Sequence, residues 1–407
     1  MTDQPIQNVN PGKVFNSTAK AFGELLKEEM AKNSHFYFFS PDETTSNKLD
    51  AVYNVTARVW GDLDRASWDM PESASGRIVE MLSENTLFAV MAGHVLSGEP
   101  AMMTSYEAFF EIIAAQVVQH LKFLEQSEAV DWRPKYPAIN LLSTSTCWRQ
   151  DHNGFSHQSP ILISTLLARP GSHVNCLFPI DDVSARYVYK FMMSSRNVVN
   201  LATFNKTEEP RWIDEGHANF QFENGASILG FASDGDTFNP RADEHFDAVF
   251  AVAGDIATRE AIYATKILRE DIPGIRIRIV NIVSLTYNAI GTTEKQLSQE
   301  TFNNYFTNDS YIISNFHGYA NTLKNIIANY ADNARISAHG FNEQGSTTTP
   351  FLMLTMNGAS RYDLAIDAAK RLGREDLAIK YQDKITKNQA YAIENGVDLP
   401  EIQDYNF

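Results

Sequence analysis

Two histidines stand five positions apart in the polar stretch RQDHNGFSHQ, residues 149–158, of a chain with only 10 His among 407 residues. The stretch also carries Gln150, Asp151 and Asn153. His152 and His157 lack the spacing of two ligands on one helix face, and no further cluster completes a zinc pattern, so the sequence predicts no metal site. Neutral hydrogen-bonding groups beside groups that transfer protons favour a polar wall around a hydroxylated substrate.

A carboxylate among apolar residues is the second candidate. Glu84 lies in LSENT, with Leu82, Leu87 and Phe88 as neighbours. Apolar surroundings disfavour the charged form of a carboxyl group and raise its pKa, which suits a group that holds a proton near neutral pH. The alternative is an ordinary, solvent-facing glutamate at the start of a helix.

Two short stretches combine aromatic, hydroxyl and cationic side chains. TSYEAFF places Tyr106 close to Phe109, a pattern typical of an aromatic helix start packed into a core. TSNKL places Ser46 two residues before Lys48, a pair able to hold a phosphate, although an N-cap followed by a surface lysine has the same pattern. No Ser or Cys lies in the sequence context of a nucleophile elbow.

These candidates follow apolar segments that are typical of strands. The segment 138–146, AINLLSTST, runs directly into the histidine stretch, and 173–180 and 198–206 repeat the pattern of apolar strand and polar loop. Segments with helical apolar spacing, such as 19–31 and 107–124, alternate with them. This order predicts a parallel sheet covered on both faces, with ligands beyond the carboxyl ends of its strands.

The length of the chain predicts two domains. We expect an α/β fold with two doubly wound domains, the second one smaller, each with a mostly parallel sheet. The polar residues 1–17 predict a flexible lead-in, 18–206 the first domain and 246–407 the second. Residues 207–245 are rich in Gly, Pro, Asp and Glu, which is typical of an interdomain linker.

Charge and composition indicate which partners and which cellular compartment to expect. The net charge of −16 argues against a nucleic-acid surface, and no run of about 18 apolar residues suggests a membrane span. The start of the chain lacks the basic and apolar regions of a signal peptide. Only two cysteines, Cys147 and Cys176, are present, and we interpret them as small buried hydrophobes in a reducing compartment. The sequence predicts a cytoplasmic protein.

Seven stretches, in chain order, resemble the motifs of phosphoketolases, which are thiamine-diphosphate-dependent relatives of transketolase. They are SPDETTSNKL, MLSEN…TSYEAFF, QDHNGFSHQ, SSRNVVN…NK, FAVAGDIATREA, FHGY and GSTTTPF. The resemblance runs from about residue 18 to 375, and its most specific parts are QDHNGFSHQ and SPDET…SN. It implies a pyrimidine-binding domain followed by a transketolase-like C-terminal domain.

The resemblance also implies a role for each candidate. Glu84 resembles the glutamate at the aminopyrimidine ring nitrogen of the cofactor, and Phe109 resembles the aromatic residue stacked on that ring, with Tyr106 beside it. His157 resembles the histidine that faces the reacting carbons, and His152 joins it as a catalytic candidate. The residues that match positions around the sugar and its phosphate are Ser46, Lys48, Tyr106, Gln150, His152, Asn153 and Lys206.

Some features depart from the family pattern. Asn85 follows the glutamate where a histidine is usual, and Lys48 stands where arginine is common. The family's Gly-Asp-Gly motif, which with a later asparagine holds the cofactor diphosphate and its Mg²⁺, has only the near match SDGD at 233–236. We therefore expect this chain to hold the pyrimidine end of thiamine diphosphate and a partner domain to hold the diphosphate and the Mg²⁺.

The expected activity is that of a carbon–carbon lyase. Xylulose 5-phosphate or fructose 6-phosphate would react with inorganic phosphate to give acetyl phosphate and an aldose phosphate. The chain would be inactive alone and would work as a homodimer, with a separate diphosphate-binding chain, or both. The alternatives are a non-catalytic remnant that dimerises or binds a partner, and a transketolase-like transfer of a two-carbon unit.

Overall fold

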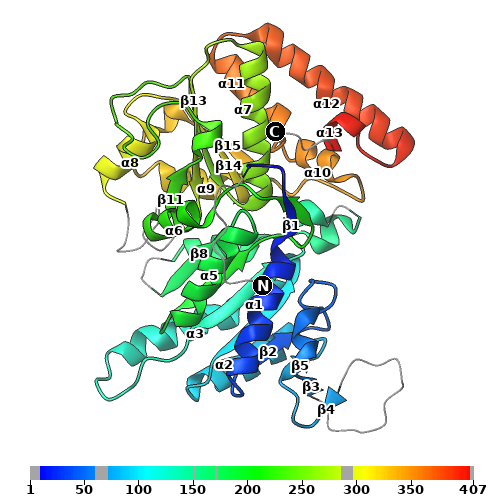
Figure 1. The fold of residues 1–407 in the computed structure, drawn as a ribbon, viewed down its shortest axis with the longest axis vertical. Helices are drawn as coiled ribbons and strands as arrows, with labels where there is room; N and C mark the ends of the chain where they lie inside the picture. The colour runs from blue at the N-terminus through cyan, green and yellow to red at the C-terminus, as the bar shows by residue number, and fades with distance from the viewer. Residues whose placement is uncertain (1–9, 60–71, 151, 170–172, 286–296, 404–407) are drawn as a thin grey trace.

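Two α/β domains, each built on its own sheet, make up the chain (Figure 1). The computed structural model describes residues 10–59, 72–150, 152–169, 173–285 and 297–403. This architecture, with mostly parallel sheets, confirms the predicted fold class. None of the helices within the described ranges has the length and apolar character needed to cross a membrane.

The first sheet has eight strands in the order β4-β3-β5-β2-β6-β7-β9-β8, and every pairing in it is parallel. Neighbouring residues such as Met102 and Met103 point to opposite faces and are both fully buried. Each central strand therefore reads as a continuous apolar run. The strands are β2 (Tyr37–Ser40), β3 (Arg58–Val59), β4 (Glu72–Ser73), β5 (Ile78–Glu80), β6 (Ala101–Tyr106), β7 (Ile139–Thr144), β8 (Val174–Leu177) and β9 (Val199–Thr203).

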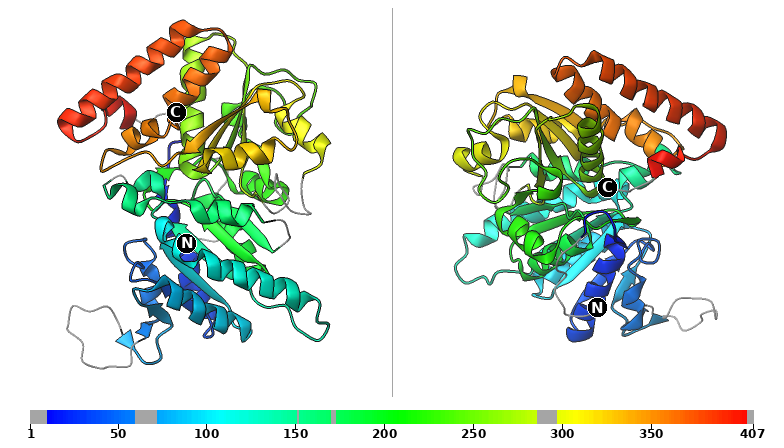
Figure 2. Two further views of the ribbon diagram at one scale, coloured as in Figure 1. Left: turned by 180° about the vertical axis from the view of Figure 1, so that it is seen from behind. Right: turned by 45° about the horizontal axis from the view of Figure 1, so that its top comes forward.

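Helices cover both faces of this sheet. α1 (Thr18–Lys32) and α5 (Asp182–Ser194) pack on one face, where Phe22 and Met192 share a core with Phe38. α2 (Glu84–Leu96), α3 (Ala114–Glu128) and α4 (Ile161–Leu167) pack on the other. Seen from behind in Figure 2, α3 is the long teal helix in front of the sheet. The predicted helix 107–124 differs in its first part, because Glu107–Ile113 forms the 3-10 segment η2 before α3 begins.

The second sheet has the order β11-β13-β12-β14-β15, with only the edge strand β11 antiparallel. Its strands are β11 (Ala226–Ile228), β12 (Ala248–Ala253), β13 (Ile277–Ile282), β14 (Ile312–Tyr319) and β15 (Ile336–Phe341). α7 (Asp255–Asp271), α11 (Arg361–Arg371) and α12 (Glu375–Asn395) cover one face, and α8 (Gln299–Phe306) and α9 (Ala320–Ile327) cover the other. α10 (Pro350–Met356) and α13 (Pro400–Gln403) complete the C-terminal part.

The segment predicted as a linker, 207–245, contains regular structure. β10 (Glu208–Pro210) pairs with β1 (Phe15–Ser17), which itself lies in the predicted lead-in. α6 (Glu215–Asn224) leads into β11, the edge strand of the second sheet. α6 buries only Ala218 and Gln221, so its sequence lacks the apolar periodicity that predicts a helix.

The two domains meet at the carboxyl ends of their strands. Glu107, directly after β6, bonds to His317 near the end of β14, and Asn205, after β9, bonds to Asp255 at the start of α7. Phe178 also packs edge-on against Phe316, with 5.6 Å between ring centres. The polar loops of the first domain therefore lie against the second domain.

Candidate functional site

Three adjacent strands carry most of the predicted residues. β6, β7 and β9 are neighbours in the sheet, and Tyr106, Gln150 and Lys206 follow their carboxyl ends. Because parallel strands end at the same edge of a sheet, their following loops come together there. The fold thus gathers residues that are up to 100 positions apart in the chain.

Aromatic rings form the centre of the site. The rings of Tyr106 and Phe109 are nearly parallel, at 6° with 6.1 Å between their centres. His157 meets both rings edge-on, at 6.2 Å from Tyr106 and 5.3 Å from Phe109. Tyr106 and Phe109 are half-buried, unlike the fully buried pair that an aromatic helix start in a core would give.

Lys206 and Glu43 hold Tyr106 from two sides. The Lys206 Nζ lies 4.6 Å from the centre of the Tyr106 ring and 3.5 Å from its hydroxyl oxygen. The Tyr106 backbone N–H donates to the Glu43 Oε2 over 2.8 Å. Burial, together with the charge of Glu84, raises the pKa of Glu43 to about 7. The sequence interpretation missed Glu43, although it lies in the quoted stretch SPDETTSNKL.

Glu84 is the first residue of α2. Ser83 caps this helix, and its hydroxyl accepts from the Thr86 backbone N–H over 3.4 Å. Glu84 is half-buried, whereas Leu82 is 83% exposed. The apolar surroundings expected around the carboxyl group are therefore only partly present within the chain, because Leu87 and Phe88 face the core and Leu82 faces solvent.

The histidine stretch folds into short 3-10 turns, η3 (Cys147–Arg149) and η4 (Gly154–His157). Gln150 is fully buried, and neither its amide nitrogen nor its amide oxygen has a hydrogen-bond partner among the described residues. Burial lowers the pKa of His157, and the charge of His152 lowers it further. The His157 imidazole is therefore neutral at pH 7 and able to accept a proton. Asp151 lies outside the described residues.

A pocket of about 600 Å³ opens beside these turns. Arg149, His152 and Lys206 line it from the first domain, and Thr348 and Thr349 line it from the second. The Arg149 Nε is buried without a hydrogen-bond partner among the described residues. Cationic and hydroxyl groups around one pocket suit a phosphorylated ligand. The sequence interpretation missed Arg149 and the two threonines, although RQDHNGFSHQ and GSTTTPF contain them.

Ser46 and Lys48 lie on the turns after β2, which also carry Glu43. Both are exposed, and the Ser46 hydroxyl donates to the Glu43 carbonyl oxygen in the same turn. Lys48 has a φ of +62°, a conformation that is strained for a side chain with a Cβ. Asn153, by contrast, stays within the histidine stretch, where its backbone N–H donates to the Gln150 carbonyl.

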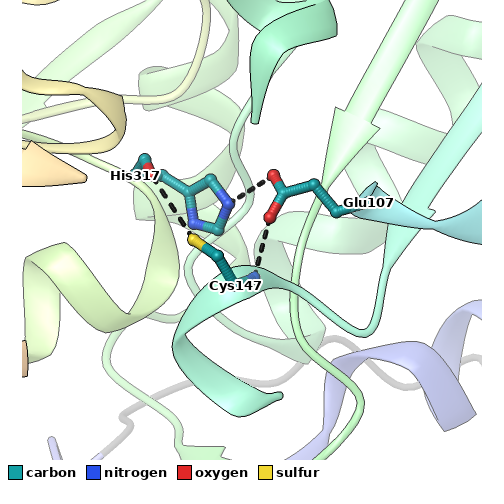
Figure 3. A group of neighbouring side chains, drawn as sticks. All are labelled: Glu107, Cys147 and His317. Atoms are coloured by element: carbon teal, nitrogen blue, oxygen red, sulfur yellow. Dashed lines mark hydrogen bonds and ion pairs between the residues drawn. The ribbon is translucent and has the colours of Figure 1, made fainter. Parts of the chain in front are cut away.

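A buried cluster is formed by Glu107, which follows Tyr106 in the chain, with Cys147 and His317 (Figure 3). The His317 Nε2 donates to the Glu107 Oε1 over 2.7 Å, and the Cys147 backbone N–H donates to the Glu107 Oε2 over 2.8 Å. One atom from each of the three side chains lies within 4.8 Å of the others, which is close enough for a metal ion. Burial and the charge of Glu107 raise the pKa of the Cys147 thiol well above its ordinary value, which opposes formation of a thiolate ligand.

A chain of ion pairs continues from the pocket into the second domain. Glu209 joins Arg149 and Arg259, at 2.7 and 2.8 Å, and Glu260 joins Arg259 and Arg361. We call Arg149, Glu209, Arg259, Glu260 and Arg361 the ion-pair chain. All five side chains are at least nine-tenths buried, and such charges are tolerated inside a protein only when they are paired.

Comparisons with known sequences cover almost the whole chain. Residues 20–195 match the family model of D-xylulose 5-phosphate/D-fructose 6-phosphate phosphoketolase, and residues 206–407 match the model of the C-terminal domain of that family. A probable phosphoketolase of Pseudomonas putida is 36% identical over 407 residues, and one of Rhodopseudomonas palustris is 34% identical over 415. The alignments cover 98% and 100% of this chain but 50% and 52% of those proteins, so the chain spans about half their length.

Solved structures with a similar fold are transketolases. A transketolase of Pichia stipitis in complex with sedoheptulose 7-phosphate has a TM-score of 0.67 at 17% identity, over 90% of this chain and 47% of that one. A split-gene transketolase described as an inactive β4 tetramer has a TM-score of 0.58 at 16% identity. The match covers 88% of this chain and 98% of that one. At these identities the likeness concerns the fold alone.

Proposed function

Because the chain belongs to the D-xylulose 5-phosphate/D-fructose 6-phosphate phosphoketolase family, we propose that it supplies the pyrimidine-binding and sugar-phosphate-binding part of such an enzyme. The complete enzyme would cleave xylulose 5-phosphate or fructose 6-phosphate with inorganic phosphate, giving acetyl phosphate, an aldose phosphate and water. The observation that carries this proposal is the grouping of Tyr106, Phe109, His157 and Lys206 at one sheet edge.

The residues present fit the pyrimidine end of thiamine diphosphate. Phe109 offers a half-buried aromatic face, and the charge of Glu84 reaches Glu43, which bonds to the backbone of Tyr106 next to that face. Glu84 would hold the proton on the pyrimidine ring nitrogen. When bound, the cofactor supplies an electron sink for the two-carbon unit. The diphosphate and its Mg²⁺ would be held by a partner domain.

The other residues would act on the sugar phosphate. His157, neutral at pH 7, would accept and return a proton as the donor sugar is cleaved. Lys206 and Arg149 would bind phosphate oxygens in the pocket, where Arg149 adds a planar set of donors that a lysine lacks. The Gln150 amide, which has no hydrogen-bond partner among the residues that the structure describes, would bind sugar hydroxyl groups together with the neighbouring His152 and Asn153.

An exposed apolar surface supports the need for a partner. α2 buries Leu87 and Met91, while Val90 on its other side is 48% exposed and the nearby Leu82 is 83% exposed. Ile112 on η2, which packs against α2, is 47% exposed. Exposed apolar patches of this kind mark association surfaces. We therefore propose a homodimer, a heteromer with a diphosphate-binding chain, or both.

Reconstitution tests the proposal. The chain would be combined with a separately produced N-terminal half of the Pseudomonas putida relative, with thiamine diphosphate and Mg²⁺, and acetyl phosphate would be measured from xylulose 5-phosphate and phosphate. We expect no product from the chain alone and phosphate-dependent product from the complex. Transfer to an added aldose phosphate without phosphate would indicate transketolase-type chemistry instead. An assembled, cofactor-loaded complex without turnover would indicate a non-catalytic remnant.

Glu84→Gln sharpens the same assay. The amide has nearly the shape of the carboxyl group but cannot hold the proton, so turnover should fall about 10²- to 10⁴-fold while folding is retained. Glu375→Gln, at the exposed start of α12, is the matched control and should leave turnover unchanged. Near-normal turnover of Glu84→Gln would show that Glu84 is an ordinary helix residue without a catalytic role.

A further inference from the structure

Each strand-end loop of the site is tied to the second domain by the residue next to a candidate. Tyr106 precedes Glu107, which bonds to His317 on β14. Gln150 follows Arg149, the first member of the ion-pair chain. Lys206 follows Asn205, whose backbone and side-chain N–H groups both donate to the Asp255 carboxylate, over 2.8 and 2.7 Å. The second domain thus reaches the site through neighbours of the site residues.

Glu107 makes the tie that lies next to Tyr106. Its carboxylate is 2% exposed and joins three segments: its own turn η2, the turn η3 through the Cys147 N–H, and β14 through His317 (Figure 3). A buried carboxylate needs a charged or hydrogen-bonding partner in a fixed place, because water cannot replace a lost one. Any movement of η2 relative to β14 would separate the Glu107 carboxylate from His317 and leave a buried charge without its partner. The tie therefore resists movement of Tyr106.

We propose that the Glu107–His317 ion pair is a positioning element, through which the second domain fixes the Tyr106 loop against the Cys147–Gln150 turn. The pair holds a proton and no metal ion. It touches no ligand, and it acts through Tyr106 and Gln150. Its effect on sugar-phosphate binding rests on the proposed function, whereas its effect on the two loops does not.

Two carboxylates favour a charged His317 imidazole, although its Nδ1 is buried without a hydrogen-bond partner among the described residues. Burial alone would lower its pKa, but the Glu107 carboxylate and the charge of Asp255 on α7 outweigh burial and raise the pKa. The Cys147 thiol on η3 stays protonated and neutral, and the Trp148 ring meets the imidazole edge-on at 6.4 Å. A metal ion would have to displace protons from both His317 and Cys147, which this environment opposes.

His339 provides a matched control within the second domain. Its Nε2 lies 3.0 Å from an Asp367 carboxylate oxygen, and the pair joins β15 to α11 without reaching the first domain. Burial lowers its pKa, and the bond to Asp367 outweighs burial and raises it. His317→Gln and His339→Gln therefore remove similar charges from similar pairs, and only the first pair ties the two domains together.

Hydrogen exchange of the full chain tests the positioning role. In His317→Gln the Cys147 amide, which donates to Glu107, should exchange about 10- to 100-fold faster, the effect of weakening a buried charged bond. The Trp212 amide, which donates to the buried Asp181, should keep its rate, and His339→Gln should leave Cys147 unchanged. Glu107→Gln combined with His317→Gln restores a neutral amide pair and should recover part of the protection. Equal acceleration of both amides in His317→Gln would overturn the proposal.

Two further measurements complete the test. Nitrogen-15 NMR of the histidine rings should show both His317 ring nitrogens protonated at pH 7. A neutral His317 ring would overturn the ion pair. Stoichiometric binding of added Zn²⁺ that is lost when Cys147 is replaced would also overturn it. In the reconstituted enzyme, His317→Gln should raise the KM for xylulose 5-phosphate about tenfold with a smaller change in kcat. If the Cys147 amide exchanges faster in His317→Gln but sugar-phosphate binding is unchanged, the role assigned to Tyr106 in binding is refuted. The conclusion that the ion pair positions the two loops would still hold.

Discussion

His157 and His317 contact two residues of the same 3-10 turn, Phe109 and Glu107, and their pKa values shift in opposite directions. His157 meets Phe109 from the histidine stretch, where burial and the interaction with His152 lower its pKa. His317 meets Glu107 from the second domain, where a carboxylate partner raises its pKa. One imidazole is suited to move a proton and the other to keep one, so the partner of a histidine, more than its residue type, decides what it can do.

The same contrast separates the two regions as a whole. At the candidate site, Gln150 and Arg149 have buried polar atoms without hydrogen-bond partners within the described part of the chain, and Glu43 holds a carboxyl group with a raised pKa. Glu107, between the domains, and Glu260, within the second domain, each accept from two or more donors, although the His317 Nδ1 has no hydrogen-bond partner among the described residues. Unsatisfied groups leave capacity for a ligand, whereas saturated ones stabilise the arrangement of the loops. The following substitutions test this division, beginning with the largest expected effect on stability.

Glu260→Gln should break the ion-pair chain. Glu260 is fully buried and accepts from Arg259 and from the backbone and side chain of Arg361, which lowers its pKa to about 2 despite burial. The substitution takes the Glu260 charge away from two buried guanidinium groups, of which Arg259 keeps its pair with Glu209, so the free energy of unfolding at pH 7 should fall by about 3–5 kcal/mol. Urea unfolding measures it. The exposed pair of Arg374 and Asp376 supplies the control, since Asp376→Asn should barely change the midpoint.

The pH dependence of the stability of the same variant tests whether the charge of Glu260 stabilises the folded chain. Because the folded-state pKa of Glu260 lies below its unfolded value of 4.5, its contribution is complete above pH 4.5 and is lost as the pH falls toward 2. The difference between the wild type and Glu260→Gln should therefore shrink on acidification. A difference that stays constant from pH 6 to pH 3 would show that Glu260 acts through packing and not through its charge.

Local patterns in the sequence predicted the fold far better than they predicted these ion pairs. The helix expected at 19–31 corresponds to α1 (Thr18–Lys32), because its apolar spacing is regular and Ser17 caps its start. Strands buried on both faces, such as β7, were recognisable as apolar runs. Glu107 and His317 are 210 positions apart, so no spacing rule joins them, and only the meeting of the two sheets creates the pair.

The site was predictable to the extent that it lies on single loops. RQDHNGFSHQ and TSYEAFF contain His157, Tyr106 and Phe109, whose rings the structure brings together, and the resemblance added Lys206 from a third loop. The raised pKa of Glu43 escaped the sequence, because burial beside Glu84 depends on how the turn after β2 folds back over Tyr106. The roles of these residues remain predictions.

Glu43→Gln tests the ligand-facing region. The pKa of Glu43 rises from 4.5 in the unfolded chain to about 7 in the folded one, so ionisation of this group costs stability as the pH rises from about 4.5 to 7. An amide does not ionise but still accepts from the Tyr106 N–H. The free energy of unfolding of the variant, relative to the wild type, should therefore increase by up to about 3 kcal/mol over this range. Parallel stability curves from pH 5 to 7.5 would contradict the raised pKa.

The smallest effect is expected at Lys48, on the exposed turn. Glycine adopts the φ of +62° without steric strain, so Lys48→Gly should stabilise the chain by about 0.5–1 kcal/mol after the flexibility of glycine in the unfolded state is counted. The lost charge should raise the KM for xylulose 5-phosphate only about two- to threefold, since an exposed cation attracts a phosphate weakly through water. Lys206→Ala removes a cation from the pocket itself and should raise the same KM about tenfold or more. The reason is that Lys206 would bind the sugar phosphate inside the pocket, where the contact is less hydrated than one at the exposed Lys48. If the two substitutions change the KM equally, the phosphate of the sugar extends to the turn after β2. The ligand-facing region then includes Ser46 and Lys48 on equal terms with the pocket.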